Sequence, residues 1–273
     1  MHAKLDTARV FERIFKIYGD QFTLLIPTAL VLFIPVAVLN GLVWTSGGLL
    51  AYALSSLIAA IATYWYQGMV VEAVRDILDG RRDQTIGGLF SSAAPFVWPL
   101  LGAGILAGIG VAIGLVLLIV PGLFLLTIWA VIVPAIVIDR VGVLDSFGRS
   151  RALVRGNGWQ VFGVIVVLFL VQLVVGGIIK GIAGAASDDS FAGYAIGDLI
   201  ARVLIVPLSA IAATVMYVEL RRLKGEPLAE DVGAPAGPLP PQESPPAATQ
   251  PPPDVQPPVE SPPGTRPPER PAG

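Results

Sequence analysis

The sequence predicts an all-α, polytopic membrane protein with six transmembrane helices, cytoplasmic helices at the membrane interface and a separate proline-rich C-terminal tail. Three observations lead to this fold class: the composition, the placement of long uncharged runs, and a change in composition near residue 225. Of the 273 residues, 54% are hydrophobic and 14% are charged, whereas soluble domains average about 45–50% apolar and about 25% charged residues. This surplus of apolar side chains cannot be enclosed in one core beneath a wettable surface, so a soluble enzyme is not expected.

The uncharged runs predict where the six spans lie. No Asp, Glu, Lys or Arg occurs in residues 21–71, 84–138, 156–179 and 203–218. About 20 helical residues cross a hydrocarbon core about 30 Å thick, so each of the two longer runs holds two crossings. Their breaks are expected at Thr45–Gly48 and at Pro121–Gly122. The predicted spans are therefore 22–44, 49–71, 97–119, 122–138, 159–180 and 199–219.

A short amphipathic helix is expected before each odd-numbered span. Before the first span, Phe11, Ile14, Phe15, Tyr18 and Phe22 share one face at helical spacing, with charged side chains opposite. Such a helix lies flat in the interface with its basic face toward lipid headgroups. Weaker patterns precede the third and fifth spans, at 86–90 and 144–154. The chain is therefore interpreted as three units, each an interfacial helix and a transmembrane hairpin, starting near residues 1, 83 and 141.

The basic residues predict the orientation in the membrane. Fourteen Lys and Arg residues of the first 224 fall on one side of the predicted spans, whereas Lys180 and Arg202 lie near the other side. Because short loops rich in Lys and Arg remain in the cytoplasm, both termini are expected there. The first apolar run is too long for a removed signal peptide and is expected to anchor the chain.

Residues 225–273 form a second predicted region. Seventeen of these 49 residues are proline, and seven acidic residues face two basic ones. Few apolar side chains are available to offset the entropy of ordering, so the tail is expected to be disordered, with polyproline II character. Two roles stay open: runs such as Pro251–Pro253 suit the aromatic-lined groove of a cytoplasmic protein partner, or the tail is an acidic solubilising segment. The predicted domains are thus 1–224 and 225–273.

Four polar residues of the spans are candidate site residues: Gln172, Lys180, Asp198 and Arg202. Asp198 and Arg202 are four residues apart and share a helix face, and an ionisable group inside a membrane is a candidate functional site. However, Arg202 precedes Glu219 by about 25 Å of helix, so the pair also fits the outer interface, where Lys180 would lie too. Gln172, like the Ser and Thr residues of the spans, fits either an interhelical hydrogen bond or a substrate path.

Glycines of the third span predict close helix packing. Gly104 with Gly108, and Gly110 with Gly114, form two GxxxG pairs that allow another helix backbone to approach. No catalytic, cofactor or metal site is predicted, because cysteine is absent, the single histidine is His2, and the sequence contains no GxSxG, HExxH or Walker motif. No nucleic-acid partner is expected.

A set of residues in the centre of the chain resembles a known family. The set is Val120–Leu126, Trp129, Pro134, Asp139, Arg149–Ser150, Leu153–Gly156 and Trp159–Gly163. It is similar to the membrane domain associated with bacterial glycerophosphoryl diester phosphodiesterases and with related six-helix bacterial membrane proteins, although Asp139 stands where that family is expected to have glutamate. The resemblance implies a multi-pass protein of the bacterial cytoplasmic membrane. It implies the membrane domain without the enzyme, because the catalytic barrel of those phosphodiesterases needs about 250 further residues.

Two functions follow from these observations. The first is a non-enzymatic accessory or scaffold module for envelope or lipid-linked proteins, held in the lipid bilayer. The alternative is a small transporter or permease component, because Pro27, Pro35, Pro134 and Pro207 are placed to interrupt helices around a cavity. A water-filled cavity lined by Gln172 and by Ser and Thr side chains would favour transport, whereas a dry, closely packed bundle would favour the scaffold.

Overall fold

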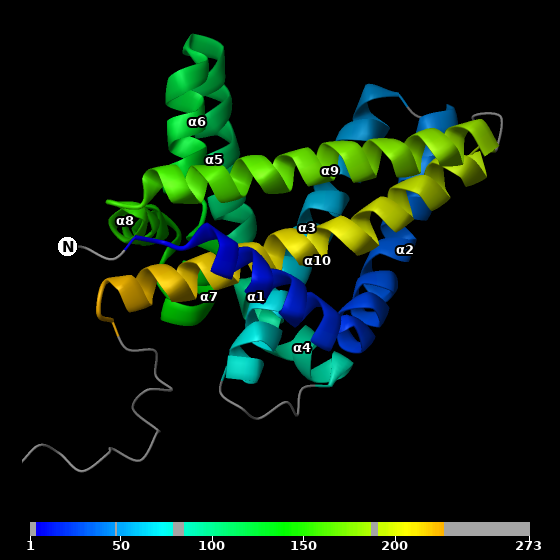
Figure 1. The fold of residues 1–273 in the computed structure, drawn as a ribbon. Coiled ribbons are helices and arrows are strands. Elements are labelled where there is room, and N and C mark those ends of the chain that lie inside the picture. Colours follow the sequence, from blue (N-terminus) through cyan, green and yellow to red (C-terminus); the bar gives the residue numbers. More distant parts are fainter. Residues whose placement is uncertain (1–3, 47, 79–84, 187–190, 227–273) are drawn as a thin grey trace, which may run out of the picture. The chain divides into compact units, whose positions relative to one another are not determined.

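The computed structural model describes residues 4–46, 48–78, 85–186 and 191–226. The chain divides into two compact units, 1–234 and 235–273, and the fold described here lies in the first; the predicted disorder of 227–273 falls outside the described residues. All regular structure in the described residues is helical (Figure 1). The elements are α1 (Thr7–Asp20), α2 (Phe22–Ser46), α3 (Leu49–Leu78), α4 (Ile86–Ala93), η1 (Ala94–Phe96), α5 (Val97–Leu117), α6 (Ile119–Ile128), α7 (Ile132–Asp139), α8 (Val143–Val154), α9 (Gly158–Ala186) and α10 (Phe191–Leu223).

Six segments are long and apolar enough to cross a membrane, in agreement with the predicted number. They are Phe22–Val43, Leu49–Ile77, Ile86–Leu117, Ile119–Asp139, Gly158–Ala186 and Ala195–Leu223. Several helices run beyond the uncharged stretches that predicted them; α3, for example, continues through Glu72, Arg75 and Asp76. The reason is that helical hydrogen bonding does not stop where charged side chains begin, so hydropathy marks the membrane-buried part of a helix and not its ends.

The turn between the third and fourth spans lies at Leu118, and its predicted position at Pro121–Gly122 is wrong. Leu118 has an extended backbone, with φ −160° and ψ 137°, and separates α5 from α6. Pro121 falls in the first turn of α6, where the backbone N–H has no intrahelical partner, so a proline there is compatible with the helix. The fourth span is itself divided, because α6 ends at Ile128 and α7 begins at Ile132.

Three short helices, α1, α4 and α8, lie where they were predicted, before the long helices α2, α5 and α9. The second of them, α4, forms the first part of the apolar segment Ile86–Leu117. The start of α1 is capped by the Asp6 carboxylate, which accepts hydrogen bonds from two backbone N–H groups of the first turn. The buried face of α1 differs in part from the predicted one: Val10 and Ile14 are buried, whereas Phe15 is 58% exposed. The difference arises because α1 packs against α10, a contact that the spacing of apolar residues along α1 does not specify.

Helix α10 lies at the centre of this unit. It contacts α2, α9, α1 and α3, and its side chains Ile211 and Tyr217 are fully buried. Nearby, the rings of Phe33 and Tyr66 have centroids 5.5 Å apart, and the Tyr66 hydroxyl donates a hydrogen bond to the carbonyl oxygen of Leu25 at 3.0 Å. Because lipid is as apolar as these side chains, close packing and such hydrogen bonds, and not the exclusion of water, hold the helices together.

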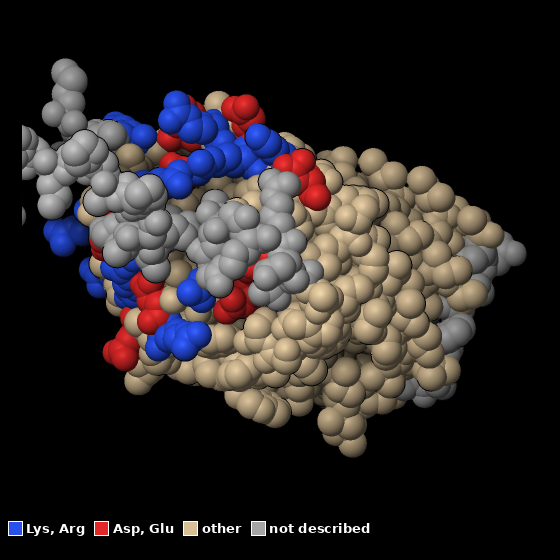
Figure 2. Space-filling model, turned by 90° about the horizontal axis from the view of Figure 1, so that it is seen from below, with Lys and Arg blue, Asp and Glu red and all other residues tan. Residues whose placement is uncertain are grey.

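Charged side chains gather at one end of the unit. Figure 2 shows Lys, Arg, Asp and Glu over the end where α8 and the C-terminal end of α10 lie, and uncharged residues over the rest of the described surface in that view. Large apolar side chains elsewhere are exposed, among them Val116, Ile119 and Leu173. A surface that is apolar over such an extent suits contact with lipid. The end that carries the charges is called the charged end below.

Candidate functional site

Three of the four predicted polar residues come together near the start of α10. The side chain of Asp198 is 3% exposed, and its Oδ2 accepts hydrogen bonds from Arg202 Nε at 2.6 Å and from Asn40 Nδ2 at 3.3 Å. Lys180 Nζ lies 3.6 Å from Asp198 Oδ1. These four residues, from α2, α9 and α10, are called the Asp198 cluster. Arg202 precedes Arg221 by 19 residues, or about 28 Å of helix, so the cluster lies about one hydrocarbon thickness from the charged end.

The Asp198 cluster places two cations around one buried carboxylate. The side chain of Arg202 is 26% exposed and that of Lys180 is 54% exposed, so both neutralise Asp198 while their outer atoms remain accessible. The cluster therefore joins three helices without needing a ligand. The sequence does not predict Asn40 as a member, because its amide carries no charge. Asn40 is also far from Asp198 in the sequence, so no local spacing pattern links the two residues.

A small cavity adjoins the Asp198 cluster. It has a volume of about 90 Å³ and is lined by Asn40, Val43, Tyr52, Ser55, Ser56, Ala59 and Arg202. A cavity of this size and polarity has room for water. Gln172 is not one of its lining residues and lies on an exposed face of α9. The structure thus brings Asn40 and two serines, but not Gln172, to the same cavity.

The predicted packing glycines meet different neighbours. These glycines are Gly104, Gly108, Gly110 and Gly114. A Cβ atom at Gly114 would lie 2.9 Å from the Cα atom of Gly122, so α5 and α6 pack backbone to backbone at this point. Gly104 faces the ring of Tyr64 in α3, Gly110 faces the indole of Trp129, and Gly108 faces open space. The close backbone approach therefore falls at one end of the second GxxxG pair.

Four side chains at the charged end form a network of ion pairs. Arg149 of α8 donates from Nε to Asp139 Oδ2 at 2.7 Å and from Nη1 to Glu226 Oε1 at 2.9 Å, and its Nη2 contacts Glu226 Oε2. Arg221 of α10 donates from Nη1 to Asp139 Oδ1 at 3.0 Å, and its Nε lies 3.5 Å from Glu226 Oε2. These residues are called the charged-end network. It ties α7, α8 and α10 to the first residues of the predicted tail.

The charged-end network keeps Arg149 and Glu226 ionised and extends the folded unit. Hydrogen bonds from Arg149 hold the pKa of Glu226 below its usual range, and the hydrogen bond to Glu226 raises the pKa of Arg149. Both side chains are therefore charged at neutral pH. Glu226 lies two residues beyond Lys224, where the membrane domain was predicted to end, so the contacts of the bundle reach into the segment assigned to the tail.

A larger pocket lies between α6 and the start of α9, which contact each other. Its volume is about 590 Å³. The lining residues are Lys4, Val120, Leu123, Phe124, Thr127, Ile128, Gly156, Gly158, Trp159, Gln160 and Phe162. This pocket is called the α6–α9 pocket. Seven of these eleven residues belong to the set that carries the family resemblance, which shows that the two halves of that set meet in space.

Asn157 lies between the lining residues Gly156 and Gly158 and ties the N-terminal segment to the start of α9. Gly156 has a φ of 95°, a conformation that glycine adopts without steric cost, and this allows the sharp turn from α8 into α9. The carbonyl oxygen of Asn157 accepts a hydrogen bond from the N–H of Val161, while its Oδ1 accepts one from the backbone N–H of Leu5 at 3.0 Å. This second bond holds the N-terminal segment, and with it Lys4, at the edge of the pocket.

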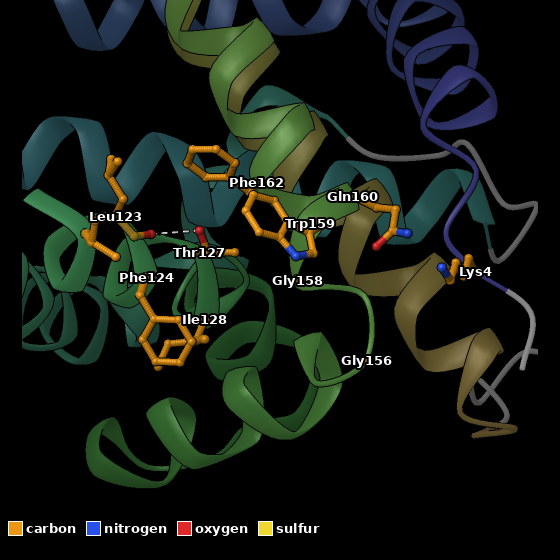
Figure 3. Close-up of a pocket in the computed structure, with 11 residues that line it drawn as sticks. Lys4, Leu123, Phe124, Thr127, Ile128, Gly156, Gly158, Trp159, Gln160 and Phe162 are labelled. Atoms are coloured by element: carbon orange, nitrogen blue, oxygen red, sulfur yellow. Dashed lines mark hydrogen bonds between the residues drawn. The ribbon is translucent and has the colours of Figure 1, made fainter.

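The α6–α9 pocket is polar on one side and apolar on the other. Figure 3 shows Lys4 and Gln160 on one side and Phe124 on the other. The hydroxyl of Thr127 is already used, because it donates to the carbonyl oxygen of Leu123 at 2.7 Å. The spacing of residues along the chain does not predict this pocket, since it forms where α6 and α9 cross and where the N-terminal segment adds a cation.

No group of three or more His, Asp or Glu side chains in the described residues is arranged to hold a metal ion. Four acidic residues follow one another at near-helical spacing, Glu72, Asp76, Asp79 and Asp83. The last two of them lie outside the described residues. The described ionisable groups of the Asp198 cluster contact one another, and so do those of the charged-end network.

Comparison with known protein families gives a match over most of the helical unit. The family model described as a domain of unknown function (DUF7847) matches residues 23–220, whereas comparison with curated proteins and with solved structures gives no match. The matched range begins at the second residue of α2 and ends in the last turn of α10. Because the match covers well over half of the chain, the chain belongs to the DUF7847 family.

Proposed function

We propose that this protein is a non-enzymatic accessory or scaffold module of the bacterial cytoplasmic membrane, with both termini in the cytoplasm, and that it holds envelope or lipid-linked proteins. The charged-end network is the observation that carries the proposal. A scaffold needs a stable platform at one membrane face, and this network joins α7, α8 and α10 at the end where the positive-inside rule expects the cytoplasm.

Two further features support a scaffold. Glu226, the last described residue of the predicted tail segment, is held in this platform, so a partner bound to the proline runs that follow would be held close to the membrane surface. The resemblance of residues 115–165 to a domain that accompanies an enzyme also favours an accessory role. On this proposal the described charged groups maintain the shape of the platform, and partner contacts come from its exposed surface and from the tail.

The test is cross-linking in native membranes followed by purification. We expect the full-length chain to bring down a defined envelope protein in a fixed ratio, and Arg149→Gln to weaken that association because the platform loosens. A chain stopped after Leu228, which keeps Glu226, separates the contribution of the tail from that of the platform. Purification of the full-length chain without any partner in a fixed ratio would overturn the proposal.

A transporter component is the second candidate, and the cavity beside Arg202 is the observation that favours it. The cavity is small, with a volume of about 90 Å³, so a transport path would require a second, more open conformation. A cysteine at Ser56 tests this directly. Modification of that cysteine by a small charged thiol reagent from both sides of the membrane supports transport, whereas modification from one side or from neither supports the scaffold.

A further inference from the structure

We propose that the α6–α9 pocket is a binding site for one anionic glycerophospholipid, with an acyl chain between α6 and α9 and the headgroup phosphate at Lys4 and Gln160. Nothing in the family assignment indicates a ligand, and this inference goes beyond the accessory function and does not depend on it.

The size and lining of the pocket suit an amphipathic ligand. Its volume of about 590 Å³ falls within the range of about 300–1,000 Å³ that is usual for sites of small molecules. Val120 and Ile128 both line it and are eight residues apart in α6, so the apolar wall extends about 12 Å along that helix. That length accommodates a large part of an acyl chain. The polar groups lie together at the other side (Figure 3).

The surroundings of the pocket favour lipid over a water-soluble ligand. Three of its lining side chains are exposed to a large extent: Val120 by 76%, Phe124 by 57% and Trp159 by 84%. All three lie in segments that are apolar enough to span a membrane. The pocket therefore opens toward the bilayer, where phospholipid is the ligand present at the highest concentration. The exposed indole of Trp159 at a helix start is also typical of the headgroup level of a membrane.

The charge at the polar side favours an anionic headgroup. None of the eleven lining residues is acidic, and Lys4 is held in place through the hydrogen bond from the Leu5 N–H to Asn157. A second cation lies close by, because Lys224 Nζ donates to the carbonyl oxygen of Arg155 at 2.9 Å, and Arg155 directly precedes the lining residue Gly156. Two ammonium groups attract a headgroup with a net negative charge more strongly than they attract a zwitterionic headgroup.

Native mass spectrometry of the full-length protein tests the site. The protein would be delipidated in detergent and then titrated separately with phosphatidylglycerol and with phosphatidylcholine. We expect one phosphatidylglycerol to bind with higher affinity than further copies, and Lys4→Gln to weaken that first binding step about fivefold, the effect of about 1 kcal/mol from one lysine near a lipid headgroup. Lys16→Gln is the matched control, because Lys16 is exposed on α1 and is not a lining residue.

A second pair of variants tests the pocket by filling it in one variant and leaving it open in the other. A Cβ atom at Gly158 or at Gly163 meets no atom within 4 Å, but only Gly158 lines the pocket. We expect Gly158→Leu to reduce binding of both lipids and Gly163→Leu to leave it unchanged. Should Gly158→Leu fail to fold, quenching of tryptophan fluorescence by phosphatidylglycerol with brominated acyl chains replaces it. Quenching should then decrease in Trp159→Phe and persist in Trp98→Phe.

Four outcomes would overturn the proposal. The first is equal binding of phosphatidylglycerol by the full-length protein and by Gly158→Leu, and the second is equal affinity of the unaltered protein, which has Lys4, for the two lipids. The third is quenching of Trp159→Phe by brominated lipid that is as strong as quenching of the unaltered chain. The fourth is a stable dimer in which a second copy covers Trp159.

Discussion

At the scale of single residues, Asp198 is the most informative side chain in the spans. It is 3% exposed and contacts two cations, Lys180 and Arg202. These cations balance its charge, although the sequence places them at the ends of two different helices. A buried carboxylate in this position costs desolvation energy that the surrounding cations offset. The pair Asp198–Arg202 was interpreted from the sequence as either an interfacial pair or a pore element. The burial of Asp198 and the third partner, Asn40, make it a link between helices.

Asp198→Asn removes the charge and keeps the shape. We expect the variant to lose about 1–3 kcal/mol of stability, because Arg202 and Lys180 lose their shared counter-charge. Lys180→Gln should cost less than about 1 kcal/mol, since the Lys180 side chain is 54% exposed. Thermal unfolding in detergent measures both variants. An equal loss in the two variants would show that Asp198 is not the central member of the cluster.

Glu226 makes part of the stability depend on pH. Its pKa is lowered in the folded protein, chiefly by hydrogen bonds from Arg149, so its contribution is present above the unfolded pKa of about 4.3 and is lost as pH falls through the lower folded value. At pH 7 we expect Glu226→Gln to unfold about 1–3 °C below the unaltered chain, because the side chain is 35% exposed and the pair is therefore weak. The difference should become smaller as the pH falls below about 4.3.

The control for that measurement is Asp6→Asn, which alters a carboxylate at the start of α1 and outside the charged-end network. Its effect on stability reports the N-terminal cap of α1 and not the charged-end network. If the gap between Glu226→Gln and the unaltered chain stayed constant from pH 7 to pH 3, ionisation of Glu226 would not stabilise the fold.

At the scale of elements, the α5–α6 hairpin depends on one close contact between backbones. Gly114 and Gly122 allow the two helices to approach just before and after the turn at Leu118. Figure 1 shows the tip of this hairpin extending away from α9, and Leu117 and Leu118 at the tip are 72% and 68% exposed. Its geometry therefore rests on the glycines and on the turn, and not on the proline that the sequence suggested as the break.

Gly114→Ala and Gly108→Ala form a matched pair for this hairpin. The Cβ atom at Gly114 would lie 2.9 Å from the Cα atom of Gly122, whereas Gly108 has no neighbour within 4 Å. We expect Gly114→Ala to destabilise the bundle by about 1–3 kcal/mol through overpacking. Gly108→Ala should be neutral or stabilise it by up to about 1 kcal/mol, because alanine favours helix. Thermal unfolding distinguishes them, and the reverse order would place the close contact at Gly108.

At the scale of the whole molecule, topology can be tested with introduced cysteines, because the natural chain contains none. With the proposed orientation, cysteines at Ser46 and Ser187 should react with an impermeant thiol reagent added from outside. Cysteines at Thr85 and Ser91, both exposed near α4, should not. Ser150 is unsuitable as an inner site, because it is buried and donates a hydrogen bond to Ile128. Labelling of all four positions from one side would contradict six spans.

The sequence by itself determined the number of spans, the three short helices before them and the segregation of charge to one end. These features are local: hydropathy over about 20 residues and the spacing of apolar side chains depend on neighbours in the chain, and lipid forces each span to satisfy its backbone as a helix. Even the errors in this part, such as the turn at Leu118 in place of Pro121–Gly122, are displacements of a few residues.

Only the tertiary structure decided which polar groups meet. Asn40 reaches Asp198, Arg149 reaches Glu226, and Leu5 reaches Asn157 across 158, 77 and 152 residues. Each contact depends on how helices pack, and packing in a membrane follows from shape and hydrogen bonds that no periodicity records. The α6–α9 pocket has the same origin: its apolar wall, its glycine turn and its lysine come from three separate parts of the chain, and they form one site only where those parts cross.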